Sequence, residues 1–196
     1  EFVVLHRGRE VGAVRWPLLG RHNVMNALAA LAAAHAVGVD PAGAIPALAG
    51  FSSVKRRLEV LGPQSGVTVY DDFAHHPTAI ATTLEGLRAK VGDARILVAM
   101  EPRSNSMRLG AHADALAPSL ALADAVVFLH RPELAWDAGA VIAAVRGQAL
   151  AVADTDALLA ALRAQARPGD HVVFVANGGF DGAPRRFLAL LDAAGT

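Results

Sequence analysis

The sequence predicts an α/β fold: a Rossmann-like αβα sandwich with a mostly parallel sheet, preceded by a shorter part of another domain. Strand and helix patterns alternate strictly from about residue 51 onward. The expected strands are near-continuous apolar runs, as a sheet covered on both faces requires. Polar loops follow these strands, as at the ligand-binding edge of such sheets. With 196 residues, 54% of them hydrophobic, the chain can bury a core of this kind.

The first 50 residues predict two strands and two helices. The expected strands are 2–5 and 11–16, and the expected helices run from about 19 to 37 and from 41 to 48. Asp40 followed by Pro41 is a favourable helix start, because Asp caps a helix and Pro suits its first position. Two strands and two helices do not complete a mononucleotide-binding fold. We therefore expect residues 1–50 to be the tail of a truncated domain.

From residue 51 the pattern changes to a hairpin followed by alternating strands and helices. The hairpin is expected to pair 58–61 with 67–70 through a turn at 62–66. Further strands are expected at 95–100, 125–129, 149–153 and 171–176. Helices are expected at 78–90, 111–122, 134–145, 155–166 and 183–191. Residues 51–196 are therefore predicted to form the Rossmann-like domain.

Composition argues against several classes of function. Lys and Arg total 18, as do Asp and Glu, so the charge balance favours neither a nucleic-acid nor an acidic-membrane partner. The absence of cysteine excludes disulfides, thiolate metal sites and a cysteine nucleophile. The apolar runs are short and interrupted, so no membrane span is expected. The cytoplasm is the expected location.

The densest group of titratable side chains lies between an expected strand and an expected helix. It contains Asp71, Asp72, His75 and His76, and Pro77 then suits the first helical position. Carboxylates and imidazoles at this edge of a sheet can contact a ligand. They are also ligands for divalent metals, so a metal-dependent phosphoesterase is an alternative. Such an enzyme would need another ligand-rich motif, and the sequence shows none.

Three further loops follow expected strands. The loop 101–108 contains Arg103 and Arg108, and guanidinium groups can bind carboxylates or phosphates through paired hydrogen bonds. A second polar loop is 130–133. The last strand ends at Asn177, followed by two glycines that let the backbone approach a ligand, although a tight turn is the commoner role of such a pair. The glycine spacing is not that of a dinucleotide-binding fingerprint.

Three motifs occur in order along the chain: Gly20-Arg21-His22-Asn23-x-x-Asn26, Val54-Lys55-Arg56-Arg57-Leu58-Glu59 and Asp71-Asp72-Phe73-Ala74-His75-His76-Pro77. This ordered set resembles the Mur ligase family, the ATP-dependent amide-forming enzymes of peptidoglycan synthesis. The resemblance covers essentially the whole chain. Two further segments are similar to the branch of the family that recycles murein peptides: Glu101-Pro102-Arg103-Ser104-Asn105-Ser106-Met107 and Val175-Ala176-Asn177-Gly178-Gly179-Phe180.

The resemblance implies a cytoplasmic ligase that uses ATP and Mg²⁺. The implied reaction joins UDP-N-acetylmuramate to the tripeptide L-Ala-γ-D-Glu-meso-diaminopimelate through an acyl phosphate, in peptidoglycan recycling and cell-wall biogenesis. A family member that adds L-alanine to the same sugar nucleotide is one alternative. A stand-alone nucleotide-binding module is another, from a different functional class.

Mur ligases have three domains, which the resemblance maps onto this chain. Residues 1–50 would be the carboxyl-terminal part of the central ATP-binding domain, and 51–196 the carboxyl-terminal domain. The amino-terminal domain and most of the central domain would then be missing partners. The only lysines are Lys55 and Lys90, and neither stands in the Gly-Lys-Ser/Thr context of a phosphate-binding loop. We therefore expect the fragment alone to hold no cofactor and to be inactive.

The resemblance also implies roles for individual residues. The expected nucleotide-binding residues are His22, Asn23, Asn26, Arg57 and Asp72. The expected catalytic residues are Arg57, Asp72, His75 and His76. The expected peptide-binding residues are Arg103, Ser104, Asn105, Arg108, Asn177 and Gly178. No metal ligand is expected, Asn23 and Asn26 could simply cap a helix, and the segment 51–57 is expected to act as a hinge for closure over ATP.

Overall fold

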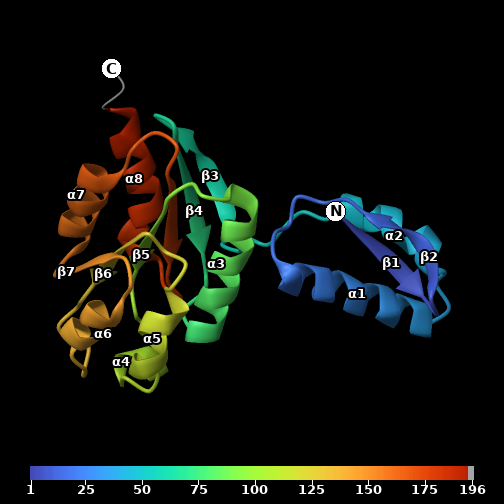
Figure 1. Cartoon of the computed structure of the whole chain (residues 1–196), viewed down its shortest axis with the longest axis horizontal. Coiled ribbons are helices and arrows are strands. Elements are labelled where there is room, and N and C mark those ends of the chain that lie inside the picture. The colour runs from blue at the N-terminus through green and yellow to red at the C-terminus, as the bar shows by residue number, and fades with distance from the viewer. Residues whose placement is uncertain (194–196) are drawn as a thin grey trace. The chain divides into compact units, whose positions relative to one another are not determined.

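The structure is a computed structural model that describes residues 1–193, and the chain divides between Val54 and Lys55 into two compact units (Figure 1). We call residues 1–54 unit 1 and the residues from Lys55 onward unit 2. Unit 1 consists of strands β1 (Phe2–His6) and β2 (Arg9–Val14) and helices α1 (Arg21–Ala36) and α2 (Pro41–Ala49). These four elements confirm the prediction, and the two strands pair as an antiparallel hairpin.

Unit 1 has a small core of its own. Val4 and Val14 from the hairpin pack with Leu31 from α1 and Ile45 from α2. The predicted start of α2 is confirmed, because the Asp40 carboxylate accepts a hydrogen bond from the Gly43 N–H at 3.2 Å. Among the residues described here, no helix is long and apolar enough to span a membrane.

Unit 2 is built on a six-stranded sheet in the order β3-β4-β8-β5-β6-β7. The strands are β3 (Glu59–Gln64), β4 (Val67–Asp72), β5 (Ile96–Met100), β6 (Ala125–Leu129), β7 (Gln148–Val152) and β8 (His171–Val175). Only the pairing of β3 with β4 is antiparallel. The predicted mostly parallel sheet and its opening hairpin are therefore confirmed.

Helices cover both faces of this sheet, as predicted for an αβα sandwich (Figure 1). The helices are α3 (Pro77–Val91), α4 (Asn105–Arg108), α5 (Ala113–Ser119), α6 (Ala138–Ala144), α7 (Thr155–Gln165) and α8 (Ala183–Asp192), with a short 3-10 turn, η1 (Phe180–Gly182). Side chains of α3, α5 and α6 pack on one face, and those of α7 and α8 on the other. Along β5, Val98 and Leu97 point to opposite faces, so both sides of the strand are buried.

Three helices differ from the prediction. Helix α4 was not predicted; the Ser104 hydroxyl caps it by accepting from the Met107 N–H at 3.4 Å. The helices expected at 111–122 and 134–145 are shorter, and Pro118 lies at the end of α5. Helix α6 starts after Asp137, whose carboxylate caps it by accepting from the Gly139 N–H at 2.7 Å, and the preceding Trp136 Nε1 donates to the Met107 carbonyl at 2.6 Å. This contact joins segments 29 residues apart, and no local pattern reveals it.

The last strand, β8, lies in the centre of the sheet. His171 at its start is in register with Thr68 of β4 on one side and Ile96 of β5 on the other. The carboxyl ends of β4, β8, β5 and β6 therefore lie side by side. Because all four strands are parallel, the loops that follow them meet at one edge of the sheet.

His171 provides a test of how this packing depends on pH. Burial lowers the pKa of His171, with a smaller contribution from Lys90 and an opposing one from Asp170, and Tyr70 Oη lies 3.0 Å from its Nδ1. The unfolded chain therefore binds more protons here below about pH 6.5, so acid should destabilise the fold. Urea denaturation at pH 5 and pH 8 measures how far the free energy of unfolding falls in acid. This fall should be smaller for His171→Gln than for the wild type. Equal losses would contradict this account.

Candidate functional site

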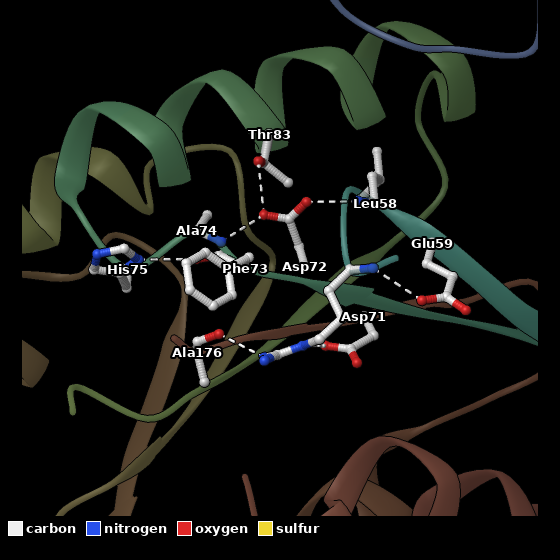
Figure 2. A network of polar contacts seen from close by, with 10 residues as sticks. Leu58, Glu59, Asp71, Asp72, Phe73, Ala74, His75, Thr83 and Ala176 are labelled. Carbon is white, nitrogen blue, oxygen red and sulfur yellow. Dashed lines mark hydrogen bonds and ion pairs between the residues drawn. The ribbon is translucent and has the colours of Figure 1, made fainter. Parts of the chain in front are cut away.

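The candidate site begins with Asp72, at the end of β4, whose carboxylate is buried and fully hydrogen-bonded (Figure 2). Asp72 Oδ1 accepts from the Ala74 N–H at 2.7 Å and from the Thr83 hydroxyl at 3.2 Å. Asp72 Oδ2 accepts from the Leu58 N–H at 2.6 Å. Only 4% of Asp72 is exposed. The carboxylate therefore ties three backbone segments together, and its direct contact with a nucleotide stays a prediction that this geometry does not favour.

The two consecutive arginines at 56 and 57 differ in their surroundings. Arg56 donates through Nε to Asp71 Oδ1 at 3.2 Å and through Nη2 to the Ala176 carbonyl at 2.6 Å. Burial raises the pKa of Asp71, and the neighbouring Arg56 opposes that rise. Arg57 is exposed, and within residues 1–193 it forms no ion pair. Its guanidinium lies 5.7 Å from the centroid of the Phe73 ring and is free to bind an anion.

His75 and His76 follow in the turn before α3. His75 Nδ1 lies 2.9 Å from the Phe73 carbonyl. His76 Nδ1 accepts from the Thr78 N–H at 3.3 Å and caps α3, and Pro77 takes the first helical turn as predicted. In the described part of the chain, neither Nε2 atom makes a hydrogen bond. Each ring can therefore present Nε2 to a ligand.

The geometry does not support the phosphoesterase alternative. Across residues 1–193, no three His, Asp or Glu side chains are arranged to hold a metal ion. The physical reason lies in Asp72, because its two oxygens are committed to Leu58, Ala74 and Thr83. The Asp72 carboxylate therefore fixes the surrounding backbone through these hydrogen bonds.

The loops after β5 and β8 bring together several of the residues expected to bind peptide. A Cβ atom at Gly178 would lie 2.6 Å from Arg103 Cδ, so the Arg103 side chain lies directly against this glycine. Asn177 precedes it, and within the described residues the Asn177 Oδ1 atom is buried without a hydrogen bond. Ser104 and Asn105 begin α4, and Arg108 is exposed at its end.

Sequence reasoning missed an ion-pair chain at the same edge. Arg131, after β6, donates to Glu101 Oε1 and to Asp181 Oδ2, both at 2.6 Å. Thr155 Oγ1 also donates to Asp181 Oδ2 at 2.8 Å. The hydrogen bond from Arg131 holds the pKa of Asp181 below its ordinary value, and that from Thr155 adds to this effect. The polar loop 130–133 was the sequence signal that could have indicated Arg131. However, Glu101, Arg131 and Asp181 follow three different strands and meet only in the folded protein.

Three expected nucleotide-binding residues lie in unit 1, on the first turns of α1. Asn23 Nδ2 donates to the Leu19 carbonyl at 2.7 Å, and Asn26 Nδ2 donates to Asn23 Oδ1 at 3.5 Å. The helix cap is Gly20, without a side-chain hydrogen bond, so the capping alternative for the two asparagines is wrong. His22 is exposed. The nucleotide roles of these three residues stay predictions.

Comparison with known proteins identifies the family. Residues 56–178 match the family model described as Mur ligase, glutamate ligase domain. The chain belongs to the Mur ligase family. The family predicted from the motifs is confirmed, and so is the αβα fold, because a crystal structure of a murein peptide ligase from Psychrobacter arcticus 273-4 superposes with a TM-score of 0.71. The two sequences are 40% identical. The match covers 91% of this chain and 38% of the chain in that crystal structure.

Two further Mur ligases are informative relatives. The UDP-N-acetylmuramate–L-alanyl-gamma-D-glutamyl-meso-2,6-diaminoheptandioate ligase of Escherichia coli (strain K12) is 49% identical over 96% of this chain and 41% of its own length. The UDP-N-acetylmuramate–L-alanine ligase of Mycobacterium sp. (strain JLS) is 37% identical over 92% of this chain and 39% of its own length. This Mur ligase chain thus spans about two fifths of the relatives that it matches.

Proposed function

We propose that this chain is part of an ATP- and Mg²⁺-dependent carboxylate–amine ligase that joins UDP-N-acetylmuramate to L-Ala-γ-D-Glu-meso-diaminopimelate in peptidoglycan recycling, in the cytoplasm. The observation that carries the proposal is the degree of identity. Two relatives named for this tripeptide are 49% and 46% identical over about 95% of the chain. The L-alanine ligase from Mycobacterium sp. (strain JLS) is 37% identical over a similar span, which favours the tripeptide as acceptor.

The proposal extends to domain organisation. We assign residues 1–50 to the carboxyl-terminal end of a central ATP-binding domain and 51–196 to the carboxyl-terminal domain. The chain spans only 41–42% of the tripeptide-ligase relatives, which supports an amino-terminal domain and the rest of a central domain as its partners. A stand-alone nucleotide-binding module would have to differ in organisation from these longer relatives.

On the nucleotide side, unit 2 offers residues that fit a polyphosphate, and unit 1 separately offers residues that fit an adenine. Bound ATP and Mg²⁺ would supply the phosphoryl group and the charge neutralisation that acyl-phosphate chemistry requires. Arg57, exposed and without an ion pair within residues 1–193, is suited to a phosphate. Asn23 and Asn26 offer amides that can pair with the N6/N7 edge of adenine, with His22 beside them. His75 and His76 lie in the turn that follows β4. In the described residues, the Nε2 atom of each ring makes no hydrogen bond and can bind a ligand.

On the acceptor side, the loops after β5 and β8 suit a ligand that carries both an ammonium group and a carboxylate. Glu101 Oε2 and Asn177 Oδ1 are buried acceptors without hydrogen bonds in the described chain. They follow adjacent strands, and Arg103 lies against Gly178 next to them. Unpaired buried acceptors are costly, so a ligand ammonium would be favoured there. The guanidinium would bind the accompanying carboxylate, with Ser104, Asn105 and Arg108 in the same loop.

A competition experiment tests this function. The full-length protein should release phosphate from ATP in the presence of UDP-N-acetylmuramate and the tripeptide, and should prefer the tripeptide to L-alanine. The 196-residue chain alone should release none, because its two lysines, Lys55 and Lys90, lie outside any phosphate-binding loop. A full-length protein that prefers L-alanine would refute the acceptor. Tripeptide-dependent phosphate release by the isolated chain would refute the assignment of the missing ATP-binding domain.

A further inference from the structure

One arginine, Arg131, connects the loops that follow three parallel strands of unit 2. It lies after β6, whereas Glu101 follows β5 and Asp181 lies beyond the end of β8. Arg131 donates through Nε to Glu101 Oε1 and through Nη2 to Asp181 Oδ2. Hydrogen bonds between charged groups are stronger than neutral ones, and two nitrogens of a planar guanidinium impose a direction on both partners. Arg131 therefore fixes the positions of the two carboxylates relative to one another.

Glu101 is the buried partner of Arg131, and it is only half satisfied. Its side chain is 1% exposed, against 33% for that of Arg131. Oε1 is bound to Arg131, but within the described residues Oε2 is buried and has no hydrogen-bond partner. A buried carboxylate oxygen without a partner is costly, which indicates a ligand that completes it. Because Oε1 is held, the Glu101 carboxylate has little freedom to rotate, and Oε2 keeps its direction.

The other partner of Arg131 lies on a strained turn. Phe180 and Asp181 have φ of 50° and 48°, in the left-handed region that residues other than glycine rarely adopt. Such a conformation persists where surrounding contacts hold it. Phe180 is buried with its ring centroid 5.7 Å from that of Phe174, and Thr155 donates to the same Asp181 oxygen as Arg131. The turn therefore presents Asp181 to Arg131 in a fixed position.

Two nitrogens of Arg131 are thus committed to carboxylates, and its effect on a ligand passes through Glu101. We propose that Arg131 is a positioning residue for the acceptor: it holds the Glu101 carboxylate so that Oε2 receives the ammonium group of the acceptor. This inference rests on the proposed function, in which the loops after β5 and β8 bind a ligand with an ammonium group and a carboxylate. A carboxylate fixed before binding loses less freedom when the ligand arrives, so it binds more tightly.

Arg131→Lys in the full-length protein tests the proposal. Lysine keeps a positive charge beside Glu101, so the buried carboxylate stays compensated and the fold is retained. It offers one nitrogen where Arg131 uses two, and it cannot hold Glu101 and Asp181 in the same geometry. KM for the tripeptide should rise about 10-fold, while kcat and KM for ATP stay within about twofold of the wild type. An unchanged tripeptide KM would overturn the proposal.

The matched control is Arg95→Lys. Arg95 is paired with the buried Asp170 at 3.0 Å, and its side chain is 33% exposed, as is that of Arg131. Arg95 and Asp170 directly precede β5 and β8, so this pair lies at the opposite edge of the same sheet. The control should leave KM for the tripeptide within about twofold of the wild type. Equal increases in the two variants would show a general effect of weakened ion pairs and would also refute the role of Arg131.

A double-mutant cycle decides whether Arg131 acts through Glu101. Glu101→Gln keeps the size of the side chain and removes its charge. In that background, Arg131→Lys should raise KM for the tripeptide by no more than about twofold. Equal factors in the two backgrounds would mean that Arg131 acts by another route, and the proposal would fail.

The outcome is separate from the identity of the acceptor. L-Alanine also carries an ammonium group and a carboxylate. A wild-type protein that prefers L-alanine would refute the proposed tripeptide, and the same cycle measured with L-alanine would still confirm or refute the role of Arg131.

Discussion

Arg57→Ala in the full-length protein is expected to lower kcat/KM for ATP by about 10²–10³-fold, or about 3–4 kcal/mol of transition-state stabilisation. The expectation follows from the two adjacent arginines. Arg56 is committed to Asp71 and to the Ala176 carbonyl, whereas Arg57 is exposed without an ion pair in the described residues. Steady-state kinetics at saturating sugar nucleotide and tripeptide would measure the change. The melting temperature should change little, because Arg57 is exposed.

The matched control for this substitution is Arg185→Ala. Arg185 is also exposed, but it lies on α8, and its removal changes the net charge by the same amount. It should leave kcat/KM for ATP unaltered. If Arg57→Ala also leaves this ratio unaltered, Arg57 does not contact the nucleotide. If the two variants lose activity equally, the effect belongs to the change in net charge and not to the position of Arg57.

Gly178→Ala is expected to raise KM for the tripeptide by about 10- to 100-fold, the effect of losing a charge-assisted hydrogen bond. The added Cβ would lie 2.6 Å from Arg103 Cδ and 2.9 Å from Arg103 Nη1, so the guanidinium must move. Arg103 is exposed, so the fold should accommodate this displacement. KM for ATP should therefore stay close to the wild-type value. Initial rates over a range of tripeptide concentrations would measure the effect.

Gly179→Ala is the control next to it in the chain. A Cβ at position 179 would meet no atom within 4 Å, so Arg103 keeps its place. This variant should bind the tripeptide as the wild type does. An unchanged tripeptide KM in Gly178→Ala would show that the position of Arg103 against Gly178 does not matter for the acceptor. Equal increases in both variants would point to backbone flexibility of the loop instead.

The sequence by itself determined the strands, most of the helices and the loops that carry polar groups. The apolar runs at β5, β6 and β8 are buried on both faces, and such burial requires hydrophobic side chains at every position. Pro77 and Asp40 located two helix starts, because capping depends on neighbours in the chain. The family was also determined in this way, since its motifs are short contiguous segments.

Only the tertiary structure decided which of these polar residues act together. Nothing local places β8 in the centre of the sheet, yet that position brings the loop that contains Asn177 next to the loop that begins at Glu101. The sequence presents Arg56 and Arg57 as equivalent neighbours, and only contacts from distant strands make Arg56 an anchor and leave Arg57 exposed. Asp72 stands in a motif of ligand-type residues, but the fold buries it. Burial and hydrogen-bond partners come from segments far apart in the chain, so local patterns cannot specify them.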